Sequence, residues 1–155
     1  MKNKRILIVI ILLLCALGIA IIFKHDNPAT LLPDEAASSW QGKQELVKEK
    51  TDVKQIAIPG FDSLVFVAGQ TEQKVNFYNP KENDCLIVFS LHIDNKEFWR
   101  SGYCQPDNGY YTITLNEPLE TGKYKAQLLN QCYKPDGTPL NSANVDFNLT
   151  VQEKE

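Results

Sequence analysis

Three side chains of this sequence, one of its two histidines and two of its glutamates, are the candidates for acid–base chemistry. His92 lies in a run of residues that predicts a β-strand, and Glu117 and Glu120 flank a predicted turn. A pair of carboxylates acts as acid and base only where a cleft raises the pKa of one of them. The motifs G-x-S-x-G and H-E-x-x-H and a glycine-rich phosphate loop are absent from the sequence. We therefore expect no catalytic residues, with a wall-active enzyme or accessory subunit as the alternative.

Three cysteines follow residue 24 and could form a disulfide. Cys85 begins one predicted strand, and Cys132 ends another that runs antiparallel to it, with both side chains on the same face. Thiols placed in this way outside a membrane can form a bridge. Counting back from the turn near Asn95 brings Cys104 opposite Cys85 instead, so Cys85–Cys104 is the second choice and no bridge is the third. The sequence has no C-x-x-C or paired His–Cys spacing, so we expect no metal and no cofactor.

A short aromatic segment, FWRSGY at residues 98–103, is the best candidate for a binding surface. It falls on a predicted edge strand, so either Phe98 or Trp99 must point away from the core. Exposed Trp, Tyr and Arg are the residue types that concentrate binding energy in interfaces. The predicted binding residues are Trp99, Arg100, Tyr103 and Tyr110.

Regular alternation of apolar and polar residues begins at residue 54 and predicts strands with one buried face. Val75 and Phe77 show this pattern, and residues 85–93 are apolar on both faces at their start, which is typical of a central strand. Turn residues separate about eight predicted strands, at 54–58, 63–68, 73–78, 85–93, 97–103, 110–115, 123–132 and 144–151. Many short antiparallel strands of this kind indicate a sandwich or a barrel.

Two features favour an all-β, immunoglobulin-like antiparallel sandwich of about seven or eight strands. Tyr124 follows the corner LETGK and resembles the tyrosine corner of such folds. The long predicted strands 85–93, 123–132 and 144–151 would be strands C, F and G, which belong to one sheet. The predicted domain covers residues 54–155.

Residues 6–23, ILIVIILLLCALGIAIIF, form an apolar run without a charged side chain. As a helix this run would be about 27 Å long, close to the ~30 Å hydrocarbon thickness of a bilayer. Lys2, Lys4 and Arg5 precede it, and positive flanks stay on the cytoplasmic side. We predict a single transmembrane helix that anchors the chain in the cell membrane, with residues 1–5 in the cytoplasm and the C-terminal domain extracellular.

Cleavage of the apolar run is the alternative to its retention. Residues 16–18 have a suitable A-x-A-like spacing, but a cut there would fall inside the run, and residues 36–38 lie well beyond it. Cys15 offers lipid attachment as a further alternative, although Leu14 stands where such signals require a small residue. We favour retention as an anchor.

Residues 24–53 are polar, contain Pro28 and Pro33, and have no sustained apolar periodicity, as expected for an extracytoplasmic stalk. Trp40 is the exception. A lone Trp in a polar linker usually packs back on its domain, and less often marks a binding epitope. Packing of Trp40 over the strand at 97–103 would hide the aromatic surface, an alternative that we weigh equally with exposure.

The charge distribution limits the partners. Residues 24–155 carry 13 basic and 19 acidic side chains, a net charge of −6. Binding to nucleic acid requires clustered Lys and Arg, and docking to an anionic lipid surface is opposed by the same acidic balance. We expect the partners to be the membrane, through the single helix, and another protein, with no nucleic acid and no small molecule.

Four short motifs, IPGFDSLVFVAG, VNFYNPKENDC, LNEPLETGKY and TPLNSANVDFNLTV, together resemble a family of small surface proteins of Gram-positive bacteria. Members of that family have an N-terminal membrane anchor, a polar stalk and one immunoglobulin-like domain. The resemblance covers roughly residues 40–151 and implies the same fold and location. The family has no established biochemical activity and no catalytic residues to carry over to this chain, so the resemblance leaves the function open. The expected function is a non-catalytic interaction module at the cell surface, which binds a surface protein, a secretion or conjugation apparatus, or a wall component.

Overall fold

The structure, a computed structural model, describes residues 31–42, 58 and 63–154, and it is all-β in these residues. The strands are β1 (Ser38–Ser39), β2 (Ser63–Val67), β3 (Glu72–Asn79), β4 (Leu86–Ile93), β5 (Lys96–Arg100), β6 (Asn108–Thr114), β7 (Gly122–Tyr133) and β8 (Pro139–Gln152). The predicted anchor at 6–23 and, apart from residue 58, the predicted strand at 54–58 lie outside the described residues. The other seven predicted strands are confirmed, with boundaries that differ by a few residues at most of their ends and by five at the start of β8.

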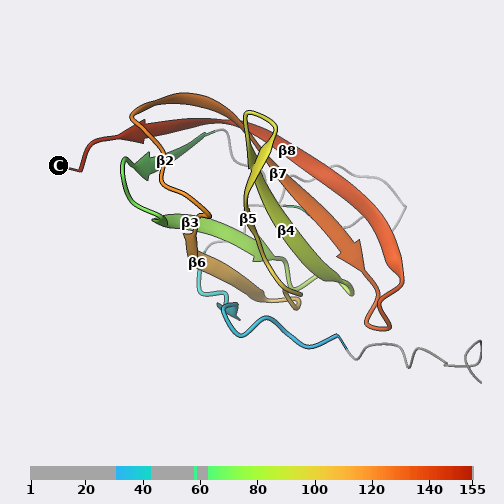
Figure 1. The fold of residues 1–155 in the computed structure, drawn as a ribbon. Helices are drawn as coiled ribbons and strands as arrows, with labels where there is room; N and C mark the ends of the chain where they lie inside the picture. The colour runs from blue at the N-terminus through green and yellow to red at the C-terminus, as the bar shows by residue number, and fades with distance from the viewer. Residues whose placement is uncertain (1–30, 43–57, 59–62, 155) are drawn as a thin grey trace, which may run out of the picture. The chain divides into compact units, whose positions relative to one another are not determined.

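The strands form two sheets (Figure 1). One sheet has three strands in the order β1-β6-β3, and the other has five in the order β2-β8-β7-β4-β5. All neighbouring strands are antiparallel except β2 and β8, which are parallel. The central position predicted for residues 85–93 is confirmed, because β4 lies between β7 and β5 and Ile87 to Leu91 are all buried.

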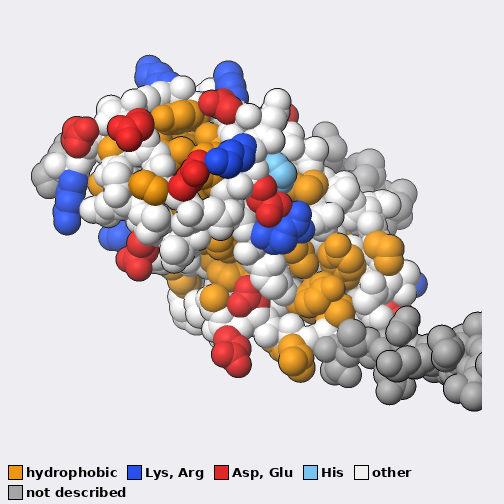
Figure 2. Space-filling view, viewed as in Figure 1, with side chains coloured by type: hydrophobic (Ala, Val, Ile, Leu, Met, Phe, Trp, Pro, Cys, Tyr) orange, Lys and Arg blue, Asp and Glu red, His pale blue; other side chains and the backbone are white. Residues whose placement is uncertain are grey.

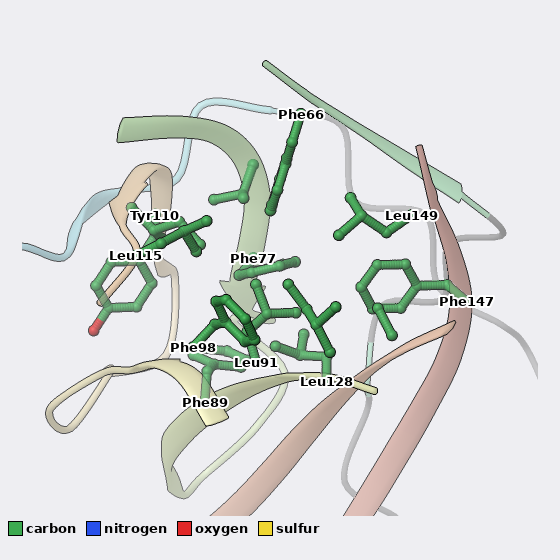
Figure 3. Close-up of a cluster of buried hydrophobic side chains, with 14 of the residues drawn as sticks. Phe66, Phe77, Phe89, Leu91, Phe98, Tyr110, Leu115, Leu128, Phe147 and Leu149 are labelled. Atoms are coloured by element: carbon green, nitrogen blue, oxygen red, sulfur yellow. The ribbon is translucent and has the colours of Figure 1, made fainter. Parts of the chain in front are cut away.

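Side chains from both sheets pack into a single core (Figure 3). Phe77 of β3 lies near the middle of this cluster, with Phe89 of β4 on one side and Phe147 of β8 on another. Every second residue of β7 from Ala126 to Cys132 is buried, which is the period-two pattern that the sequence predicts. Burial of each large apolar side chain contributes about 1.5–3 kcal/mol to the free energy of folding.

The predicted corner before β7 is present. The hydroxyl of Tyr124 donates a 2.8 Å hydrogen bond to the backbone carbonyl of Glu120, four residues earlier. A Cβ built on Gly122 would lie 3.3 Å from the Tyr124 ring, so a residue with little bulk fits under the ring at this corner. The contact ties the corner at Glu120 to the first turn-proximal residues of β7.

A β-bulge in β5 corrects one prediction about the aromatic segment. Leu91 pairs with Trp99 and His92 pairs with Glu97, so Phe98 is an extra residue on β5. A bulge of this kind breaks the alternation of faces. Phe98 is therefore buried, and Trp99 also packs against the core, so that neither ring has to point away from it. The prediction that one of them points outward is wrong for this reason.

A second irregularity reverses the expected roles of two tyrosines in β6. Two residues of β3, between Lys74 and Phe77, lie opposite one residue of β6. That residue is Tyr111, which is 40% exposed, whereas its neighbour Tyr110 is buried with an exposed fraction of 2%. The sequence pattern predicts the opposite faces, because strict alternation groups Tyr111 with Ile113.

Residues 31–42 belong to the folded unit although the sequence predicts them as part of the stalk. Strand β1 pairs with the start of β6, and the Trp40 ring stacks between Tyr78 and Tyr111 at centroid distances of 4.4 and 4.7 Å. A Cβ on Gly109 would lie 2.9 Å from Trp40, so glycine is needed under the indole. The packing of Trp40 on the domain is confirmed, but Trp40 covers the three-stranded sheet and not β5.

Candidate functional site

Of the four predicted binding residues, Trp99 and Arg100 lie on the same edge strand but point to different environments. Trp99 is half-buried, and its ring meets Tyr110 edge-on at 5.1 Å and Phe77 at 6.0 Å. Arg100 is exposed, and its guanidinium donates to Glu97 Oε2 at 2.7 Å and to Gln131 Oε1 at 2.9 Å. Arg100 is thus held in one orientation at the surface, whereas Trp99 packs against the hydrophobic core.

Tyr103 and Tyr110, the other two predicted residues, are also separated. Tyr103 is half-buried and packs edge-to-face on Tyr133 at 5.4 Å. Tyr110 is inside the domain, and its hydroxyl donates to Asp34 Oδ2 at 2.7 Å. Tyr110 therefore contributes no exposed area, which corrects its assignment to a surface. A binding role for the remaining residues stays a prediction.

The outer face of the five-stranded sheet carries a row of polar side chains that crosses four strands. Glu97 of β5 pairs with His92 of β4, His92 pairs with Gln127 of β7, and Gln127 pairs with Asp146 of β8. Glu97 Oε2 lies 3.7 Å from His92 Nε2, and Gln127 Nε2 donates to Asp146 Oδ1 at 2.8 Å. We call these four residues the polar row. The strands hold it rigidly, because each member sits at a fixed register position.

A shallow hollow of about 290 Å³ lies along the polar row. Its lining is mostly polar and consists of His92, Asp94, Asn95, Lys125, Ala126, Gln127 and Asp146. The buried Nε2 atom of His92 has no hydrogen-bond partner among the described residues. Sequence reasoning missed this site, since the pairing of strands far apart in the chain decides which polar residues meet. The one available signal was the alternation that places His92 and Gln127 on outward faces.

Glu97 is the main source of negative charge at the β5 end of the polar row. The hydrogen bond from Arg100 holds the pKa of the Glu97 carboxyl below its usual value, although partial burial opposes this effect. Glu97 therefore stays ionised at neutral pH and keeps Arg100 in place. The row ends in an ion pair on β5 and in the carboxylate of Asp146 on β8.

The glutamates considered for acid–base chemistry do not join this hollow. Glu117 Oε1 accepts a 2.6 Å hydrogen bond from Lys96 Nζ in an exposed ion pair. The backbone carbonyl of Glu120 accepts the hydrogen bond from the Tyr124 hydroxyl. Neither residue lines the hollow beside His92. Within residues 31–42 and 63–154, no group of three or more His, Cys, Asp or Glu side chains is arranged to hold a metal ion.

The three cysteines of the domain are buried free thiols in this structure. Cys85 and Cys132 hydrogen bond to each other, and this contact lowers the pKa of Cys85 and raises that of Cys132. Cys104 pairs with Ile87 and not with Cys85, and its thiol faces the carbonyl oxygen of Asn108 at 3.3 Å. Burial raises the pKa of the Cys104 thiol to about 12. A Cys85–Cys132 bridge stays a prediction that this geometry favours over Cys85–Cys104.

Comparisons with known protein families, with curated proteins and with solved structures gave no match for this chain.

In the part of the chain that the structure describes, no helix is long and apolar enough to cross a bilayer.

Proposed function

We propose that this protein is a membrane-anchored, non-catalytic interaction module with an immunoglobulin-like fold, and that it binds another extracellular protein through the outer face of its five-stranded sheet. The fold assignment is supported by the order β8-β7-β4-β5, which corresponds to strands G, F, C and C′. The pairing of β3 with β6 corresponds to strands B and E of the opposite sheet. The hydrogen bond from Tyr124 to Glu120 matches the tyrosine corner.

The observation that carries the binding proposal is the polar row beside an oriented arginine. Glu97, His92, Gln127 and Asp146 present donors and acceptors on four rigid strands. Arg100 lies at one end of the row, where Glu97 and Gln131 fix its guanidinium. A guanidinium held in this way loses little side-chain entropy on binding, so it is suited to anchor a protein partner. Figure 2 shows acidic and basic side chains close together on the visible face of the domain.

The binding proposal is tested by crosslinking in living cells followed by mass spectrometry, and then by affinity capture with variants. Arg100→Ala and Gln127→Ala should reduce capture of the crosslinked partner while the melting temperature stays within a few degrees of the wild type. Lys74→Ala, an exposed cation on the three-stranded sheet, is the matched control and should capture normally. Equal capture by all three variants would remove the outer face as the binding site. Trp99 is unsuitable for this test, because its substitution disturbs the core.

The anchor is tested separately. Because residues 6–23 are an apolar run of transmembrane length, the full chain should stay in the membrane fraction at alkaline pH. Protease added to intact cells should degrade the C-terminal domain, since the positive residues precede the apolar run. Release of the chain at alkaline pH, or protection of the domain from the protease, would contradict the proposed topology.

The alternative of a wall-active enzyme has one observation in its favour, the hollow beside His92. A general base there would be His92, with Glu97 Oε2 at 3.7 Å to orient it. This alternative requires release of soluble fragments from cell-wall glycan or peptide by the purified full chain, and loss of that release in His92→Gln. If the wild-type chain releases soluble fragments from neither the glycan nor the peptide of the wall, the enzyme alternative is rejected and the binding module remains the proposed function.

A further inference from the structure

An apolar surface lies at the end of the domain where the described chain begins. It consists of Leu31, Leu32, Pro33, Tyr103, Tyr133 and Leu140, which we call the apolar end. Contacts join Pro33, Tyr103 and Tyr133, Leu32 precedes Pro33 in the chain, and Leu140 follows Pro139, the residue that pairs with Tyr133. Pro33 pairs with Tyr103, Tyr103 packs on Tyr133, and a Cβ built on Gly137 of the β7–β8 turn would lie 3.7 Å from Leu31. In Figure 2 hydrophobic side chains gather on the side of the domain that carries the β7–β8 turn in Figure 1.

The exposure of the apolar end is not explained by the fold. Leu32 is 74% exposed, more than any other large hydrophobic side chain within residues 31–42 and 63–154, and Leu140 is 39% exposed. An apolar surface that a domain leaves uncovered usually marks a contact with a membrane or another macromolecule. The combination of Leu with amphipathic Tyr is the composition that proteins place at the boundary between lipid and water.

The length of the preceding chain indicates what covers the apolar end. The apolar run ends at Phe23, and only eight residue steps separate it from Leu31. Fully extended, these steps span at most about 27 Å, and as a flexible chain they span about 15 Å on average. Since residues 31–42 pack on the domain, the spacer is much shorter than a 30-residue stalk. Within the domain, the β2–β3 turn lies at the opposite end from Leu31, separated from it by the length of a strand, about 26 Å for β3.

Charge does not attract the apolar end to phosphate groups. The β7–β8 turn carries Lys134 and Asp136, whose charges cancel. The residues from 24 onward have a net charge of −6. The contact must therefore come from apolar burial and from the high local concentration that a short tether produces, and not from attraction to anionic lipid.

We propose that the apolar end docks on the lipid–water interface of the same bilayer that holds residues 6–23. Leu32 and Leu140 enter the interface, with the rings of Tyr103 and Tyr133 behind them. Docking turns the outer face of the five-stranded sheet sideways, parallel to the membrane normal, where a partner on the same surface can reach it. This inference rests on the membrane anchor of the proposed function.

The test uses the full chain inserted in phosphatidylcholine vesicles, with Cys15→Ala to remove the reactive thiol of the apolar run. An environment-sensitive fluorophore is attached to Lys134→Cys in the β7–β8 turn or, as a control, to Gln70→Cys in the β2–β3 turn. The native thiols are buried and stay unlabelled in the folded chain. Lipids with a nitroxide near the headgroup should quench the label at 134 by at least half and leave the label at 70 unchanged.

Substitution of the docking leucines identifies the surface. The Leu32→Glu, Leu140→Glu double variant should abolish quenching at position 134, whereas Val65→Glu, an exposed apolar side chain of β2, should leave it intact. A label at 134 that stays unquenched in the wild type overturns the docking proposal. A label that is shielded from water but not quenched by the lipid assigns the apolar end to protein contact, which also overturns it.

The outcome for the anchor is read independently. Alkaline extraction of the same vesicles shows whether the chain is inserted. Extraction of the chain defeats the proposed function and the docking proposal together. Retention of the chain with no quenching at position 134 defeats the docking proposal alone.

Discussion

The hydroxyl of Tyr110 donates a 2.7 Å hydrogen bond to Asp34 Oδ2 and so links the middle strand of the three-stranded sheet to a residue that precedes β1. The same carboxylate accepts hydrogen bonds from the backbone N–H groups of Gly102 at 2.7 Å and Ala36 at 2.9 Å. One local donor, from Ala36, and two distant donors, from Gly102 and Tyr110, thus meet at one side chain. Asp34 is one of the residues that attach residues 31–42, which we call the entering segment, to the rest of the domain.

We expect Asp34→Ala to destabilise the domain by about 2 kcal/mol, because it removes charge-assisted hydrogen bonds and leaves the Tyr110 hydroxyl without its acceptor. The measurement is the urea midpoint of unfolding. Glu35→Ala, at the exposed neighbouring position, is the control and should change the midpoint little. Equal midpoints for the two variants would show that the carboxylate of Asp34 is not a structural link.

The contribution of Asp34 should depend on pH in a defined direction. Burial raises the pKa of this carboxyl, but the hydrogen bonds from Ala36, Tyr110 and Gly102 outweigh burial and bring the pKa below the ordinary value of 3.8. A lowered pKa in the folded state means that the stabilisation is complete above the unfolded-state pKa and is lost as the pH falls through the folded-state pKa.

The stability difference between the wild type and Asp34→Asn should therefore be constant from about pH 7 to about pH 5 and should shrink below about pH 4. Urea unfolding at a series of pH values measures it. A difference that grows on acidification would contradict the assigned direction of the pKa shift.

Trp40 should contribute more to stability than any other residue of the entering segment. Its indole is 9% exposed and is stacked between Tyr78 and Tyr111. Trp40→Ala should cost about 3 kcal/mol or more, whereas Trp40→Phe keeps one aromatic ring in the slot and should cost less. Chemical denaturation distinguishes the two. If both variants unfold at the wild-type midpoint, residues 31–42 act only as a linker.

The corner hydrogen bond of Tyr124 allows a prediction with a small and specific change. Tyr124→Phe removes only the hydroxyl that donates to Glu120 and should lower the unfolding free energy by about 1 kcal/mol. Tyr103→Phe is the matched control, because Tyr103 packs through its ring on Tyr133. Thermal unfolding of both variants makes the comparison, and a larger loss in Tyr103→Phe would argue against a structural corner.

The thiols of Cys85 and Cys132 should form a disulfide when the protein is refolded in the presence of oxidised glutathione, because both thiols are buried once the chain has folded. One thiolate attacks glutathione disulfide, the second thiol resolves the mixed disulfide, and glutathione disulfide accepts two electrons to become two thiols. The bridge would close a loop of roughly 50 residues and, by the chain-entropy model, stabilise the domain by about 4 kcal/mol.

Peptide mapping without reduction reads the pairing directly. A linked pair that contains Cys85 and Cys132 is expected, and it should persist in Cys104→Ala and disappear in Cys132→Ser. Recovery of a Cys85–Cys104 pair in the wild type would reverse the assignment.

The period-two pattern allowed seven strands and most of the core to be predicted, because one face of each strand is buried. Its failures occur where the pairing contains an extra residue. Phe98 and Trp99 both meet the core because β5 has a bulge, and Tyr110 replaces Tyr111 inside because β6 shifts against β3. A bulge leaves no clear mark in the alternation of a single strand, since it is a property of two paired strands.

The polar row was not predictable for a related reason. His92 and Gln127 are recognisable as outward residues of separate strands, but their pairing depends on the register between β4 and β7. The entering segment was missed because its attachment rests on Asp34 and Trp40, two residues in a stretch with no periodic pattern. Local composition indicated a linker, and specific long-range contacts decided otherwise.

The bulge at Phe98 also affects how copies of this protein behave when they meet at high concentration. Strand β5 is the outermost strand of its sheet, and Lys96, Glu97 and Arg100 place charges along it. Edge strands that are flat and apolar recruit strands of neighbouring molecules into aggregates, and a bulge combined with charged side chains opposes this. The distortion that turns two aromatic rings inward therefore also protects the exposed border of the larger sheet from aggregation.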